Sequence, residues 1–223
     1  MKTCIVIPAY NEATVIRGVL ESIKQKYQDI VVIDDASTDT TFDEAHSTGV
    51  VVLQHLINRG QGAALKTGII YALNHGADAI VTFDADGQHD PNEIASLLEP
   101  IEKNEVDVTL GSRFLKDGSN IPPLRRIALQ AGIVFTQVLS RINITDTHNG
   151  FRCMNRSAAE KIKIVQDRMT HASEILDEIV RNKLRYREVP VTITYSYYSK
   201  DKGQKTSEMF RIAFKIFIHK LTH

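Results

Sequence analysis

Residues 81–91 read Val-Thr-Phe-Asp-Ala-Asp-Gly-Gln-His-Asp-Pro, an apolar run that leads directly into two aspartates spaced i, i+2. Side chains at i and i+2 of an extended segment point the same way, so Asp84 and Asp86 can converge on one hard cation. Mg²⁺ or Mn²⁺ suits oxygen ligands and keeps open positions for substrate phosphates. The alternative is a turn that Gly87 assists, with a helix beginning at Pro91. The pattern makes this a candidate metal site for a nucleotide substrate.

The sequence around this stretch alternates between apolar runs and helical patterns. The apolar runs lie at residues 4–7, 30–33, 50–53, 79–83 and 106–110, and the helical patterns near 12–26, 40–47, 61–75 and 92–103. Strands that are apolar on both faces suit a parallel sheet covered by helices, in which ligands bind beyond the carboxyl ends of the strands. The sequence therefore predicts an α/β fold with a Rossmann-like, mostly parallel sheet flanked by helices.

Composition limits the class of protein. The chain has 223 residues, of which 43% are hydrophobic, enough to build a substantial core. Its 27 basic and 27 acidic residues cancel, which argues against a protein that binds nucleic acid over its whole surface. Cys4 and Cys153 give no disulfide framework, and the apolar run at 4–7 is too short for a signal sequence or a membrane span. We expect a cytoplasmic protein.

Polar clusters follow the first, second and fourth predicted strands, at residues 8–12, 34–39 and 84–86. We expect these clusters to share one edge of the sheet. In the second cluster, Asp39 is a candidate helix cap, and Asp35 is a candidate acceptor for a base N–H or a ribose hydroxyl. Glycines in residues 58–68 open a helix, either to approach a phosphate or to pack tightly against a neighbour.

A different composition begins after about Gly111. Arg113 follows the fifth strand, where it either neutralises a departing diphosphate or is a surface arginine. Ser173 is a candidate cap, and Glu174 is either a first-turn charge or a catalytic carboxylate. The turn at residues 148–152 can serve as a substrate loop.

Two helical patterns, at residues 123–142 and 210–221, combine apolar faces with basic ends. This combination suits docking at an anionic bilayer, and burial in the core or in a dimer interface explains it as well. Residues 195–205 form a basic loop that either closes over phosphates, with Lys202 among its charges, or is simply solvated.

Five segments in this order, at 8–12, 34–39, 84–89, 111–114 and 149–152, resemble family 2 glycosyltransferases of the dolichyl- or polyprenyl-phosphate sugar synthase type. The resemblance covers nearly the whole chain and implies a GT-A fold, to which the two helical patterns above add C-terminal amphipathic helices. It implies the following roles: Pro8, Tyr10, Glu12 and Asp35 hold the nucleoside, Asp84, Asp86 and Gln88 bind Mg²⁺ or Mn²⁺, and Arg113 meets phosphate. The lysines of the 195–205 loop, Lys202 included, stand where such synthases often carry an arginine.

The resemblance also implies an activity. We expect an inverting, metal-dependent transfer of a hexose from a UDP- or GDP-sugar to a polyprenyl phosphate at the cytoplasmic membrane face, with Asp86, Arg113 and Glu174 as candidate catalytic residues. A lipid phosphate is already ionised, whereas a sugar hydroxyl acceptor needs a base, for which Glu174 is the candidate. A third hypothesis is a sugar-nucleotide-binding scaffold without turnover.

The expected organisation is one GT-A domain in two parts. Residues 1–112 form the nucleotide-sugar-binding core, and residues 113–223 form the part that faces the acceptor and the membrane. Expected partners are the nucleotide-sugar, a lipid phosphate or glycan acceptor, and the membrane surface or a membrane protein. A homo-oligomer is compatible with the sequence, and no nucleic-acid partner is expected.

Overall fold

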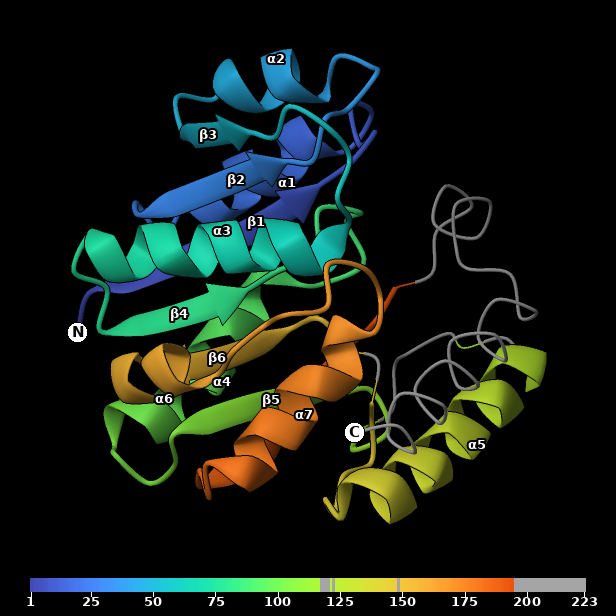
Figure 1. Cartoon of the computed structure of the whole chain (residues 1–223). Coiled ribbons are helices and arrows are strands. Elements are labelled where there is room, and N and C mark those ends of the chain that lie inside the picture. The colour runs from blue at the N-terminus through green and yellow to red at the C-terminus, as the bar shows by residue number, and fades with distance from the viewer. Residues whose placement is uncertain (117–120, 122, 148, 195–223) are drawn as a thin grey trace.

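The computed structural model describes residues 1–116, 121, 123–147 and 149–194. Its centre is a seven-stranded sheet in the order β3-β2-β1-β4-β6-β5-β7 (Figure 1). The strands are β1 (Thr3–Ala9), β2 (Ile30–Asp34), β3 (Val51–Gln54), β4 (Ala79–Thr82), β5 (Val108–Ser112), β6 (Arg152–Asn155) and β7 (Tyr186–Pro190). β6 runs antiparallel to β4 and β5, and the other pairs are parallel. The predicted mostly parallel α/β sheet is therefore confirmed.

Helices cover both faces of the sheet. They are α1 (Ile16–Lys24), α2 (Thr41–His46), α3 (Gln61–Asn74), α4 (Ile94–Glu102), α5 (Pro123–Ser140), α6 (Arg156–Lys161) and α7 (His171–Arg181). In Figure 1, α3, α6 and α7 lie in front of the sheet, and α1 and α4 lie behind it. A short 3₁₀ turn at Pro91–Glu93 leads into α4.

Strand β1 explains why the core has two layers. Cys4 and Val6 pack into the apolar cluster that contains the buried residues of α3, α6 and α7. Ile5 and Ile7 point the other way, into the cluster that contains those of α1 and α4. Because side chains alternate across a strand, a strand covered on both faces is apolar at every position. This continuous pattern made β1, β2, β4 and β5 recognisable in the sequence, and the edge strand β3 has the same apolar run although its residues are partly exposed.

The last two strands were not predicted from the sequence. β6 has only four residues between a turn and a helix, and β7 lies at the edge of the sheet with an exposed face. Neither forms a long apolar run, so periodicity did not reveal them. Both strands join the sheet formed by the first 112 residues, and the functional division at residue 112 stays a prediction.

Helix α5 confirms the helix predicted over residues 123–142. Leu129 of this helix is buried, whereas Ile127 is 66% exposed and Val134 is 60% exposed. Among the helices that the structure describes, none has the length and apolar character needed to cross a membrane. The second predicted amphipathic helix, at 210–221, and the loop with Lys202 lie outside the described residues.

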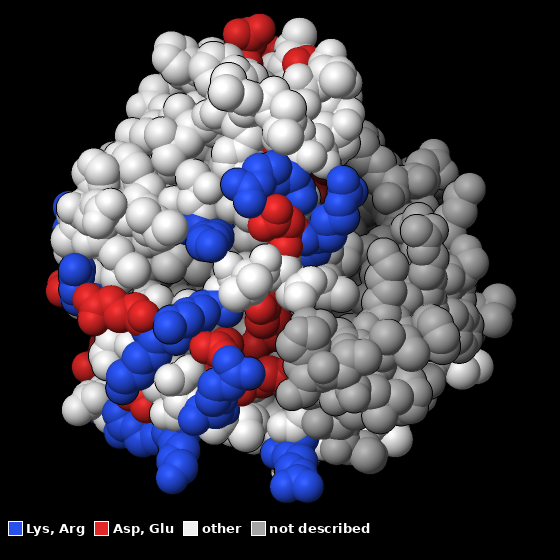
Figure 2. Space-filling model, in the orientation of Figure 1, with Lys and Arg blue, Asp and Glu red and all other residues white. Residues whose placement is uncertain are grey.

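Charge is mixed on the face shown in Figure 2. Basic and acidic side chains are interspersed over the lower part of this face. This distribution agrees with the equal numbers of basic and acidic residues in the sequence. Neither sign forms a continuous surface there.

The packing of α3 predicts opposite effects for one substitution at two glycines. A Cβ at Gly68 would lie 2.2 Å from Cγ1 of Val6 and 2.6 Å from Cδ1 of Ile33, whereas Gly18 of α1 has open space around it. We expect Gly68→Ala to lower the free energy of unfolding by about 1–3 kcal/mol. Gly18→Ala should raise it by about 0.5–1 kcal/mol, because alanine is the better helix former. Urea unfolding of both variants measures the difference, and equal effects would contradict this packing of α3.

Candidate functional site

A cavity of about 570 Å³ lies beyond the carboxyl ends of β1, β2, β4 and β5. Eight of the residues predicted from the sequence line it: Pro8, Tyr10, Glu12, Asp35, Asp84, Asp86, Gln88 and Arg113. The expectation that the polar clusters share one edge of the sheet is therefore confirmed. Parallel strands bring these clusters together because their carboxyl ends meet at the same edge.

The first two clusters hold each other in place. Ser37 Oγ accepts a hydrogen bond from the backbone N–H of Asn11 at 2.9 Å, and Thr41 Oγ1 accepts one from that of Glu12 at 2.7 Å. Asp39 accepts from the backbone N–H of Thr41 at 3.0 Å. Asp39 thus caps the first N–H of α2 as predicted, although the residue directly before the helix is Thr40, whose side chain makes no cap hydrogen bond. These contacts fix the loop that carries Tyr10 and Glu12.

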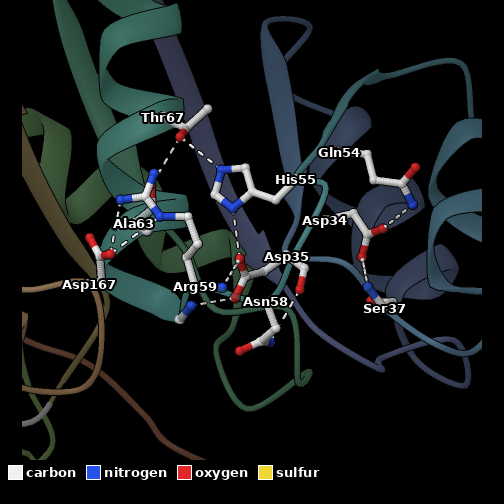
Figure 3. Close-up of polar contacts among 11 residues, drawn as sticks. Asp34, Asp35, Ser37, Gln54, His55, Asn58, Arg59, Ala63, Thr67 and Asp167 are labelled. Atoms are coloured by element: carbon white, nitrogen blue, oxygen red, sulfur yellow. Dashed lines mark hydrogen bonds and ion pairs between the residues drawn. The ribbon is translucent and has the colours of Figure 1, made fainter.

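Asp35 organises the next loop (Figure 3). It is 2% exposed, and its Oδ1 lies 2.7 Å from Nδ1 of His55. The same carboxylate accepts backbone hydrogen bonds from Arg59 at 3.0 Å and Gly60 at 2.6 Å. Three contacts thus already occupy the carboxylate that was predicted to receive the nucleoside. Its direct contact with substrate stays a prediction, while its bracing of residues 55–60 is observed.

Asp34 braces the loop as well. It is fully buried, accepts a hydrogen bond from Nε2 of Gln54 at 2.8 Å, and contacts the hydroxyl of Ser37 (Figure 3). The sequence led us to expect that one of the two adjacent carboxylates would brace the loop while the other faced the ligand. In the structure both of them hold backbone segments in place.

The glycines at the start of α3 serve close packing. A Cβ at Gly62 would lie 2.1 Å from the carbonyl oxygen of Gln166, and one at Gly60 would lie 2.7 Å from that of Asp167. Gly60 also has φ +106°, which L side chains rarely adopt. Of the two interpretations of these glycines, the structure provides direct evidence for tight packing.

Asp84 is held by neighbours from three segments. Oδ1 accepts a hydrogen bond from Nε2 of Gln61 at 2.9 Å, and Oδ2 lies 3.1 Å from Nε2 of His89. A Cβ at Gly150 would come within 2.5 Å of Oδ2, so only glycine fits there. Burial raises the pKa of Asp84. The hydrogen bond and charge of His89, with weaker contributions from His171 and Arg152, lower this pKa by more than burial raises it. The net pKa lies below the ordinary value, so this carboxylate is ionised.

Asp86 has the opposite electrostatic character. Burial, reinforced by the negative charge of Asp84, raises the pKa of Asp86 to about 6. Its Oδ1 accepts a hydrogen bond from the backbone N–H of Gln88 at 3.0 Å. The two aspartates therefore form a pair of close carboxylates that repel each other when both are charged.

Two buried arginines, Arg113 and Arg152, also line the cavity. Arg113 is 6% exposed, and its Nε donates to Oδ2 of Asp146 at 2.6 Å. Its backbone N–H donates to the same carboxylate oxygen at 3.1 Å. The alternative of an exposed surface arginine is therefore wrong. The predicted contact of Arg113 with phosphate stays a prediction, and it would involve a guanidinium that already has a carboxylate partner.

Glu174 does not line the cavity. It lies in the first turn of α7, and its Oε2 accepts hydrogen bonds from the backbone N–H groups of Val165 and Gln166 at 3.0 and 2.9 Å. Of the two roles weighed for Glu174, these contacts favour a structural, first-turn carboxylate. The predicted cap at Ser173 is wrong, because α7 begins at His171 and Thr170 is its N-cap.

Several cavity residues were not selected from the sequence as site residues: Gln61, His89, Arg152, Arg168 and His171. His89 and Arg152 stand inside segments that carried the family resemblance, so their position in those motifs was an available signal. Gln61 and His171 open helices whose starts meet only in three dimensions. Because these two residues are far apart in the sequence, no sequence motif could have predicted that they meet.

Comparison with known proteins identifies the family. The sequence profile described as glycosyl transferase family 2 matches residues 4–163. The chain is 30% identical over 239 residues to a Methanococcus voltae UDP-N-acetylglucosamine–dolichyl-phosphate N-acetylglucosaminyltransferase, covering 97% of this chain and 95% of the relative. It is also 30% identical over 230 residues to the polyprenol monophosphomannose synthase of Mycolicibacterium smegmatis, with coverages of 95% and 86%.

A solved structure supports the fold. The Mycobacterium tuberculosis glucosyl-3-phosphoglycerate synthase, crystallised with Mn²⁺, UDP-glucose and phosphoglyceric acid, superposes with a TM-score of 0.75. The superposition covers 99% of this chain and 78% of that protein, at 17% sequence identity. Because the profile match spans well over half of the sequence and the sheet agrees with that of such enzymes, the protein belongs to glycosyl transferase family 2 and is a glycosyltransferase of the GT-A fold.

Proposed function

We propose that this glycosyltransferase moves a hexose from a nucleotide-diphospho-sugar to a polyprenyl-type lipid phosphate, with inversion and with a divalent cation. The observation that carries the proposal is one cavity in which the close carboxylates of Asp84 and Asp86 lie together with the buried arginines 113 and 152. The named relatives support the acceptor class, since their names specify dolichyl phosphate and polyprenol.

The residues at the cavity fit a Mg²⁺ or Mn²⁺ ion. Asp86 and Asp84 supply oxygen donors, and burial and the charge of Asp84, which together raise the pKa of Asp86, both disfavour a second negative charge that a cation would offset. Within the described residues, no group of three or more His, Cys, Asp and Glu side chains surrounds a common point. Two carboxylates with open positions suit a cation that also contacts substrate phosphates. When bound, the ion would stabilise the charge of the leaving diphosphate.

The chemistry requires one bond to form and one to break. An oxygen of the acceptor phosphate attacks the anomeric carbon, and the bond from that carbon to the diphosphate oxygen breaks, with its electron pair going to the nucleoside diphosphate. Attack from the face opposite the leaving group inverts the configuration. A lipid phosphate is ionised before it reacts, so no protein side chain has to remove a proton.

The protein's own groups bind and orient the substrates in this proposal. Pro8, Tyr10 and Glu12, on the loop fixed by the 34–39 cluster, hold the nucleoside. Asp35 keeps residues 55–60 in position at the same side of the cavity. Asp84 is oriented by Gln61 and His89.

The contacts of Glu174 support a phosphate acceptor. A sugar hydroxyl acceptor would need a general base, and the candidate for this role is occupied with two backbone N–H groups outside the cavity lining. A phosphate acceptor needs none. The exposed Ile127 and Val134 of α5 support docking at the inner membrane face, where a lipid phosphate would reach the cavity.

Metal-dependent nucleotide binding should be lost when the carboxylate pair is reduced to one charge. We expect UDP or GDP to raise the unfolding temperature of the wild-type protein more with Mn²⁺ than with EDTA, and this difference to disappear in Asp86→Asn. Asp90→Asn is the matched control, because Asp90 caps the Pro91–Glu93 turn outside the cavity and asparagine caps equally well. A metal-dependent shift that survives in Asp86→Asn would refute the assignment of the metal to this pair.

The raised pKa of Asp86 also predicts a pH dependence of stability in metal-free protein. The folded-state pKa of about 6 exceeds the ordinary 3.8, so the folded state holds this proton more tightly than the unfolded chain does. The free energy of unfolding should therefore fall as the pH rises from about 4 to about 6, and stay lower above that range. Asp86→Asn removes this fall. Urea unfolding in EDTA should show a variant that gains stability over wild type at pH 7 and not at pH 4. A difference in stability between Asp86→Asn and wild type that does not change with pH would contradict the raised pKa of Asp86.

Glu174→Gln tests whether transfer to a lipid phosphate needs Glu174 as a general base. With undecaprenyl phosphate as acceptor, we expect the variant to retain transfer from the nucleotide-sugar that binds. It should lose about 1–2 kcal/mol of stability, because a charged acceptor of two backbone hydrogen bonds becomes neutral. Glycolipid formation and urea unfolding measure the two effects. Loss of transfer to this phosphate acceptor with unchanged nucleotide binding would contradict the proposal that no protein base is needed.

A further inference from the structure

Arg152 is the first residue of β6, and its cavity position results from the sheet. It pairs with Thr82 of β4 on one side and with Leu110 of β5 on the other. These strands lead to Asp84 and to Arg113, so Arg152 lies between the two halves of the cavity edge. It is 4% exposed and lines the cavity.

The guanidinium of Arg152 has only uncharged partners among the described residues. Nε donates to the carbonyl oxygen of Asn149 at 3.0 Å, and one terminal nitrogen donates to that of Ala172 at 3.5 Å, the limit of a hydrogen bond. No Asp or Glu of the described chain forms an ion pair with it. Arg113 differs, because its charge is matched by Asp146 at 2.6 Å.

A buried cation without a counter-ion is electrostatically unfavourable. Burial lowers the pKa of Arg152 to about 10, although the charges of Asp84 and Asp146 act in the opposite direction. A guanidinium with this pKa still carries its charge at neutral pH. The cavity therefore holds a positive charge that an incoming anion would neutralise, beside carboxylates that a cation would neutralise.

We propose that Arg152 forms an anion subsite of the cavity that binds a phosphate group of a substrate. The planar guanidinium fork matches two phosphate oxygens, and Arg152 retains N–H groups that the described protein atoms do not use. The phosphate belongs to the nucleoside diphosphate or to the lipid phosphate, which share this chemistry. The inference rests on the proposed function and adds to it the residue that supplies the charge.

The test compares ligands that differ in phosphate. Arg152→Met removes the charge and keeps the length of the side chain. Arg156→Met is the matched control, because Arg156 also donates to two backbone carbonyls, of Ala77 and Leu73, and lies outside the cavity lining. For each protein, one arm measures the affinity for UDP against uridine and for GDP against guanosine. The other arm measures the affinity for farnesyl phosphate against farnesol.

We expect Arg152→Met to weaken binding of the phosphate-bearing ligand roughly 10- to 100-fold in at least one arm. Binding of uridine, guanosine and farnesol should not change, and Arg156→Met should behave as wild type in both arms. A loss confined to the nucleotide arm assigns the subsite to the donor diphosphate, and a loss confined to the farnesyl arm assigns it to the acceptor. Equal affinities of wild type and Arg152→Met in both arms would overturn the proposal.

A purely structural role has a different signature. In that case Arg152→Met would have a lower unfolding temperature and would bind the ligands with and without phosphate equally weakly. This outcome also overturns the proposal. If Arg152→Met does not fold, Arg152→Lys decides, since it keeps the charge and loses the fork. A several-fold loss for the phosphate-bearing ligand alone supports the subsite, and wild-type affinities in both arms exclude it. Binding is measured without turnover, so absent transfer to undecaprenyl phosphate would reject the proposed function and leave this test intact.

Discussion

The buried carboxylate of Asp35 is the contact on which the geometry of the cavity depends. It lies just beyond the end of β2 and receives the backbone N–H groups of Arg59 and Gly60 at the start of α3. The next residue, Gln61, then reaches Oδ1 of Asp84 beyond β4. Each hydrogen bond to a buried charge contributes about 1.5–3 kcal/mol, and an unmatched buried carboxylate would cost at least as much. Asp35 thus fixes the start of α3 relative to the sheet, and with it the orientation of Asp84.

The cavity contains two neighbouring carboxylates and two buried arginines. Asp84 and Asp86 are like charges, and burial together with the negative charge of Asp84 raises the pKa of Asp86 to about 6. Arg113 has a carboxylate partner, Asp146, while Arg152 has backbone carbonyls. A substrate that carries phosphates together with a divalent cation would complement both features at once. This complementarity is the physical reason for proposing a nucleotide-sugar donor and an acceptor phosphate.

Sequence patterns predicted the elements whose pattern is local. β1, β2, β4 and β5 are buried almost throughout and appear as apolar runs, and the edge strand β3 does so as well because Val51, Val52 and Leu53 are apolar although partly exposed. The extended geometry expected for Asp84 and Asp86 is not observed, because β4 ends at Thr82 and Asp86 lies in a turn beyond it. β7 escaped prediction because Arg187 and Glu188 interrupt its apolar residues, so it forms no such run. Glu174 shows the limit for site residues, because a first-turn glutamate looks the same whether it faces a substrate or two backbone amides.

The sequence by itself determined the α/β class, the positions of the first five strands along the chain, and the set of polar clusters at their carboxyl ends. Only the tertiary structure decided which of these side chains are already engaged within the protein and which of them keep hydrogen-bonding capacity for a ligand. Asp35 and Arg113 have internal partners, whereas Arg152, brought between β4 and β5 by an antiparallel strand, has no carboxylate partner among the described residues. Periodicity reports burial along one segment. The pairing of charges depends on distances between segments that are far apart in the chain, and those distances exist only in the folded protein.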